Sequence, residues 1–346
     1  MVVITIIAFL MGMLTFAGYS FVVSAKESAT RATITKVDEA ILERVSAINR
    51  WHQRANGATG QRRMEQDWAN RGWPKKWGIP PAMSATPEMQ DIMLTLSRKQ
   101  SMIEAFPITP SELYQCYWFW GMFEADNSPG FTVAAETDER DLYLKQEGLM
   151  ASDGTLLLNE PGEIFLYALK NAPVFGGLPM VADDFRESEL IDPEEDGIPE
   201  LGDAWGKSLR FYRWPTRLVK GNLAYDVPWA DYVPRNMLMP NAPAGSLKQD
   251  PNDPVGEVAY RNLTSQFHDP FTWSAPLLVS AGPDGQLGLA EPTASVSVPV
   301  PSGATTFSCI GLAEPLSAQT TVPAEVQKYN EQLFDNITNH TIDGGL

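Results

Sequence analysis

The first 25 residues of the chain carry no charged side chain, and residues 26–54 contain no proline or glycine that would interrupt a helix. An uncharged apolar segment of this length can cross the hydrocarbon core of a membrane as a helix. Beyond residue 25, apolar residues recur three or four apart, which is the spacing of one helix face: Ile34, Val37, Ile41, Val45, Ile48 and Trp51. We expect one continuous helix, with a membrane-spanning half over residues 1–25 and an amphipathic stalk half over residues 26–54.

A cleaved secretory signal is the alternative interpretation of the same apolar segment. Such signals begin with basic residues, continue with an apolar core of about 7 to 15 residues and end at a cleavage site between small residues. The chain has no basic residue before its apolar run, which favours the anchor. Ser24 and Ala25, before Lys26, nevertheless fit a cleavage site.

The run Met1-Val-Val-Ile-Thr-Ile-Ile-Ala-Phe-Leu resembles the N-terminal helix of type IV pilin-like proteins and of type II secretion pseudopilins. Members of this family carry a short basic leader ending in Gly, then Phe-Thr-Leu-Ile-Glu-Leu, and only then a run like that at Met1. The resemblance therefore implies a true start upstream of Met1 and processing by a prepilin peptidase. No residue of the printed sequence is assigned to cleavage, to methylation or to the family's assembly glutamate.

The resemblance also implies a structural function. Such subunits wait in the bacterial inner (cytoplasmic) membrane as single-pass proteins with a periplasmic C-terminal domain, and then pack their apolar helices into a filament. The implied partners are further copies of the chain, other pseudopilins and the inner-membrane secretion platform. The expected assembly surface on the helix consists of Val2, Val3, Ile4, Ile6, Ile7, Phe9, Leu10, Leu14 and Phe16.

Two later segments resemble elements of the major pseudopilins. Asp203-Ala-Trp205-Gly206 is similar to the Asp-Pro-Trp-Gly turn that enters a strand in the family, with Ala204 in place of Pro. Ser280-Ala-Gly282-Pro283-Asp284-Gly285 is similar to the segment that closes the family's sheet. The resemblance implies a structural role for both.

Calcium is the one candidate cofactor. In major pseudopilins the loop after the second segment binds calcium, which implies Ser280 and Asp284 as ligands here, although the further aspartates of such loops are missing. A second set of oxygens has spacing like that of an EF-hand loop around Gly197: Asp192, Glu194, Asp196, Glu200 and Asp203. Prolines at 193 and 199 weaken this match, so a solvated acidic turn is the favoured interpretation.

Composition narrows the class of partner. The net charge is -17, and no basic cluster interleaved with aromatic residues occurs, so nucleic acid is not an expected partner. The chain has two cysteines, Cys116 and Cys309, both with apolar neighbours. They form either a disulfide, if the domain lies outside the cytoplasm, or two buried thiols.

We expect an α+β fold in which the long N-terminal helix packs on a small antiparallel sheet, with large helical and irregular insertions. Residues 55–190 form the insertion, with a helix before Pro107 and another capped by Ser111; the segment 162–175 is helix or strand. Residues 191–320 hold the pseudopilin-like β region, and residues 321–346 form a tail with a short helix.

The chain shows no recognised enzyme motif, and its three histidines lie far apart in the sequence, so we do not expect an enzyme. Two functions remain. The favoured one is a pilin-like filament subunit. The alternative is a membrane-anchored periplasmic ligand-binding or hydrolytic domain, with a candidate pocket in the aromatic region 112–131.

Overall fold

The structure is a computed structural model. It describes residues 2–53, 87–115, 149, 157–158, 160–172, 180, 184–214, 276–294, 296–299, 306–311, 313, 316, 322, 324–325, 328–329, 332 and 336–339. Within these ranges, only the backbone is described for residues 2, 87–93, 114–115, 296–299 and 306–309.

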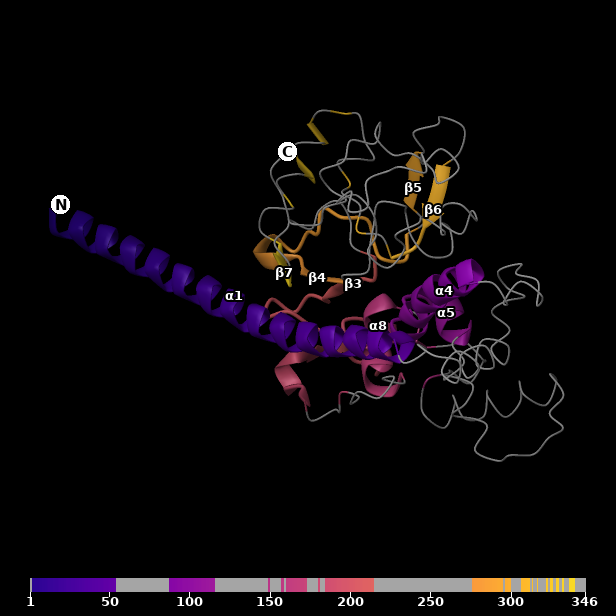
Figure 1. The fold of residues 1–346 in the computed structure, drawn as a ribbon. Helices are drawn as coiled ribbons and strands as arrows, with labels where there is room; N and C mark the ends of the chain where they lie inside the picture. Colours follow the sequence, from indigo (N-terminus) through magenta and orange to yellow (C-terminus); the bar gives the residue numbers. More distant parts are fainter. Residues whose placement is uncertain are drawn as a thin grey trace.

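The helix α1 (Val2–Gln53) contains 52 residues in one uninterrupted run. At about 1.5 Å per residue it is ~78 Å long. Its N-terminal half extends away from the other described elements, and its C-terminal half lies among them (Figure 1). The predicted continuous helix is therefore confirmed.

The two halves of α1 differ in burial as the sequence pattern predicts. In the first half the large apolar side chains are exposed, as at Leu14, which is 76% exposed. In the second half Ile34, Val37, Ile41 and Ile48 are buried in the main hydrophobic core. The apolar surface removed from water here fixes the stalk to the globular part of the chain.

The strands in the described part of the chain form three small antiparallel sheets. The largest has the order β3 (Arg210–Tyr212), β4 (Leu277–Ser280) and β7 (Ile337–Thr338), so its central strand pairs with segments far away in the sequence. The two others pair β1 (Leu190–Ile191) with β2 (Glu200–Leu201), and β5 (Val296–Pro299) with β6 (Thr306–Cys309). Strands β4 and β7 both contact α1, which confirms the expected α+β fold.

Three further helices complete the described fold: α4 (Pro87–Ala105), α5 (Pro110–Gln115) and α8 (Pro161–Asn171). The helix expected before Pro107 is confirmed as α4, and the segment left open between helix and strand is the helix α8. The expected Ser111 cap is wrong, because the Glu112 N–H instead donates to Thr109 Oγ1 at 3.2 Å. Pro110 then begins the helix, where its missing N–H costs no hydrogen bond.

A buried ion pair ties β3 to the helical region. The Arg213 guanidinium, 1% exposed, donates to both carboxylate oxygens of Glu112, at 2.6 and 2.9 Å. It also donates to the carbonyl of Phe106 at 2.8 Å. Burial in a dry environment strengthens such a bidentate pair and makes loss of either partner costly.

Candidate functional site

The exposed half of α1 is the first candidate functional surface. All predicted assembly residues lie in it, and the described ones among them are exposed: Val3, Ile4, Ile6, Ile7, Phe9, Leu10, Leu14 and Phe16. The side chain of Val2 lies outside the described set. Among the described residues, α1 is the single helix long and apolar enough to span a membrane or act as a signal. Such a surface requires lipid or another apolar surface to cover it.

The two motif segments of the sequence meet at the carboxylate of Asp203, which is 2% exposed. One oxygen accepts hydrogen bonds from the backbone N–H groups of Trp205 and Lys207, both at 2.9 Å. The other accepts from Ser280 Oγ at 2.7 Å, and this hydroxyl in turn accepts from the N–H of Gly282 at 3.1 Å. Residues 77 positions apart are thus joined through one buried side chain.

Both segments turn at a glycine whose backbone needs a positive φ. Gly206 has φ 77°, and Gly285 has φ 70° at the end of the short 3₁₀ helix η5 (Gly282–Asp284). Side chains with a Cβ adopt this region only at an energetic cost, so glycine allows both turns to close without strain. Trp205 packs against the main core beside the first turn. The structural roles implied for Asp203, Trp205, Gly206, Gly282, Pro283, Asp284 and Gly285 stay predictions.

Three polar contacts hold the stalk against this junction. Thr30 Oγ1 accepts from the Ala204 N–H at 3.1 Å. The Lys36 ammonium pairs with Glu189, in the 3₁₀ helix η3 (Glu187–Glu189). Asn339, directly after β7, donates to Asp38 at 2.6 Å. Of the two motif turns, the first therefore contacts the stalk directly, at Ala204.

Arg44 is a buried cation that the apolar pattern of the stalk did not predict. It is 2% exposed and donates to the carbonyls of Ala105, at the end of α4, and of Ala168 and Leu169, in the last turn of α8. A cation favours the negative end of a helix dipole. Here it adds to the hydrogen bonds that the Ala168 and Leu169 carbonyls accept from the Ala172 and Met180 N–H groups. Arg44 thereby joins three helices.

The candidate calcium ligands are engaged otherwise in the structure. The Asp192 carboxylate accepts from the N–H groups of Asp196 and Gly197, at 3.1 and 2.9 Å, and Asp284 Oδ1 accepts from the Gln286 N–H at 2.7 Å. Glu194 is exposed, whereas Glu200 is buried. In the described part of the chain, no three His, Cys, Asp or Glu side chains gather closely enough to hold a metal ion. This arrangement does not fit a calcium cage, and calcium binding stays a prediction.

Burial raises the pKa of the Glu200 carboxyl, and the neighbouring carboxylates of Glu194 and Glu160 raise it further. A hydrogen bond with Ser208 and the charge of Arg210 act in the opposite direction. The carboxylate packs on the backbone of Gly162 near the start of α8: a Cβ there would lie 2.0 Å from a Glu200 oxygen.

The disulfide hypothesis lies outside the described residues, because Cys116 and the side chain of Cys309 are not described. The same holds for most of the alternative pocket region, from residue 116 onwards.

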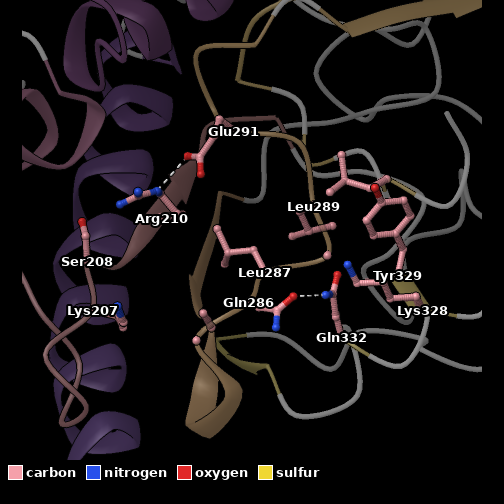
Figure 2. A pocket seen from close by; sticks show the side chains of 14 residues that line it. Lys207, Ser208, Arg210, Gln286, Leu287, Leu289, Glu291, Lys328, Tyr329 and Gln332 are labelled. Atoms are coloured by element: carbon pink, nitrogen blue, oxygen red, sulfur yellow. Dashed lines mark hydrogen bonds and ion pairs between the residues drawn. The ribbon is translucent and has the colours of Figure 1, made fainter. Parts of the chain in front are cut away.

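A groove of about 320 Å³ lies beside the second motif turn, and the sequence did not predict it. Its lining includes three cationic side chains and one carboxylate, and we call it the cationic groove: Lys207, Arg210, Glu291, Lys328, Tyr329 and Gln332. Figure 2 shows Lys207 and Arg210 on one side of it and Lys328 and Tyr329 on the other, with Leu287 and Leu289 between them. These residues are spread over more than 120 positions of sequence, so no local motif marks the site.

Comparison of the chain with protein-family models, with curated proteins and with solved structures finds no significant match. The class that the fold itself defines is a small α+β domain packed on the second half of a long apolar N-terminal helix. That helix is suited to a membrane anchor or a signal.

Proposed function

We propose that the chain is a pilin-like structural subunit of the pseudopilin type. In this account α1 anchors the subunit in the bacterial inner membrane, with the globular part in the periplasm, until the subunit enters a filament that serves type II secretion or a related machine. The partners are then further copies, other pseudopilins, the secretion platform and a prepilin peptidase that acts on an upstream leader.

One observation carries the proposal. A single helix continues without a break from an exposed, uncharged half into a half that is packed on a small antiparallel sheet. A passive anchor does not require this rigid continuity, whereas a filament built from helices does, because each helix leaving lipid must bury its apolar surface against its neighbours. The meeting of the two pseudopilin-like segments at Asp203 supports the same proposal.

Cysteine cross-linking of the full chain in native membranes tests the proposal. Variants carry two cysteines on α1, one replacing a residue of 3–7 and one replacing a residue of 10–16. Helices that pack with a regular stagger join different positions on successive copies, so oxidation of at least one such pair yields a ladder of multimers. The chain without added cysteines is the control for Cys116 and Cys309.

A ladder in the membrane fraction that resists alkaline carbonate extraction is the expected result. Monomers throughout, in a chain that stays in the membrane fraction, would instead favour the membrane-anchored ligand-binding or hydrolytic domain. Release of a chain that begins near Lys26 would identify the apolar segment as a signal.

A further inference from the structure

The cationic groove is a positively charged site on an acidic protein. The chain as a whole carries a net charge of -17, yet the groove lining has three cationic side chains and one carboxylate. Glu291 pairs with Arg210 at 2.8 Å, which leaves the two lysines as the excess charge. Within the described ranges, neither Lys207 nor Lys328 has an acidic partner. The groove therefore attracts an acidic ligand.

The shape of the groove suits an extended segment of protein. Its lining includes the apolar side chains Leu287, Leu289 and Leu316 together with the two lysines and Tyr329. Apolar side chains beside polar and charged ones are the usual composition of a protein interface.

The chain itself presents a complementary segment, which we call the acidic turn: Asp192, Pro193, Glu194, Glu195 and Asp196. Its central residues, Pro193 to Glu195, are exposed. Asp192 and Asp196 fold the turn by accepting backbone hydrogen bonds, so the two glutamates at the tip remain directed to partners outside it. None of these residues lines the groove.

The groove and the turn contact the stalk through different segments. Within one copy they are linked, because Ser208 of the groove lining pairs with Gly202, directly after β2. The segment before the acidic turn binds Lys36 through Glu189, and the segment after the groove residues 328–332 binds Asp38 through Asn339. Lys36 and Asp38 are two residues apart on α1, so their side chains leave the helix about 200° apart around its axis. When one patch of a chain binds a different patch on the next copy, two copies still leave one patch of each kind free. Such a contact therefore builds rings or filaments.

We infer that the acidic turn of one copy docks in the cationic groove of the next. This contact rests on the proposed function and deepens it, because it adds a contact between globular parts to the packing of α1. Such a charged contact orients the copies and sets their order, while the apolar helices supply most of the binding free energy.

The test uses two differently tagged full-length copies in the same membrane. One carries Pro193→Cys, and the other carries Tyr329→Cys, so that all lysines and glutamates of the contact are kept. Oxidation is expected to give a cross-linked dimer that carries both tags. Lys170→Cys paired with Pro193→Cys is the control, because Lys170 lies on α8, away from the groove lining.

Reversing the charge of the two lysines distinguishes a specific electrostatic contact from cross-linking by chance proximity. Lys207→Glu with Lys328→Glu is expected to lower the yield of the dimer about tenfold, as repulsion replaces attraction at the rim. Adding Glu194→Lys and Glu195→Lys to the partner copy restores the yield, whereas Lys170→Glu leaves it unchanged. Raising the salt concentration weakens this cross-link and leaves the α1 ladder intact.

The two proposals fail in different ways. An α1 ladder without the 193–329 dimer overturns the docking contact and leaves the filament proposal standing. A 193–329 dimer that survives the charge reversal also overturns the electrostatic contact. Absence of both cross-links overturns the docking contact together with self-association.

Discussion

Asp203 shows how one residue can determine the relative positions of distant segments. Its buried carboxylate accepts hydrogen bonds from two backbone N–H groups of its own turn and from the Ser280 hydroxyl. A buried carboxylate is tolerated only where its oxygens are satisfied in this way. The turn that Asp203 closes is the one that touches the stalk at Thr30.

Replacing Asp203 with Ala is therefore expected to lower the free energy of unfolding by about 3 kcal/mol, since buried donors lose a charged acceptor. Denaturant unfolding of the full chain in detergent micelles measures the change. Glu187→Ala, at an exposed position of η3, is the control and should change the stability little. A loss of less than about 1 kcal/mol for Asp203→Ala would contradict the central role of this carboxylate.

Glu200 predicts a dependence of stability on pH. Its pKa is raised in the folded state, so folding favours the protonated carboxyl. Its contribution to stability is complete below the unfolded pKa of about 4.3 and is lost as the pH rises through the folded pKa. Glu200→Gln removes the buried charge, and it is expected to raise the free energy of unfolding at neutral pH. The gain over the wild type should shrink towards pH 4; a gain that is equal at both pH values would contradict this explanation.

Among the elements, α1 shows best what a sequence pattern can and cannot predict. The spacing of Ile34, Val37, Ile41 and Ile48 predicted the buried face correctly. Val45 is only partly buried and Trp51 is 38% exposed, because Arg44 and His52 occupy the adjoining buried positions. Their polar atoms bind helix-end carbonyls and the hydroxyls of Ser97 and Ser101. Such partners come from distant segments, so hydrophobic periodicity cannot reveal them.

Two neighbouring positions of α1 give a matched test of the stalk interface. Ile41 is 0% exposed, and Leu42 is 47% exposed. Ile41→Ala leaves a cavity in the core and should cost about 3 kcal/mol of stability, whereas Leu42→Ala should cost less than about 0.5 kcal/mol. Equal effects, measured by denaturant unfolding of the full chain, would show that the stalk does not pack on the globular part as described.

At the scale of the whole molecule, the fold class could be predicted from the long N-terminal helix together with the resemblance of residues 203–206 and 280–285 to elements of a small antiparallel sheet. The pairing of β3, β4 and β7 could not, since the strands are short and the last lies in the expected C-terminal tail. The cationic groove could not be predicted either. Two of its cationic residues lie more than 115 positions before the third in the sequence, and only folding brings them together. Of the insertion expected at 55–190, the parts 55–86 and 116–148 lie outside the described residues.

The central claim is that the apolar helix stays on the mature protein as the anchor and assembly element of a pilin-like subunit. Mass spectrometry of the N-terminal peptide, on protein extracted from its native membranes, tests it most directly. A pilin-like subunit is expected to show a processed start upstream of Met1, at an N-methylated Phe that follows a removed leader, with residues 1–25 retained. A mature chain that begins at Lys26, or an unprocessed one that begins at Met1, would contradict it.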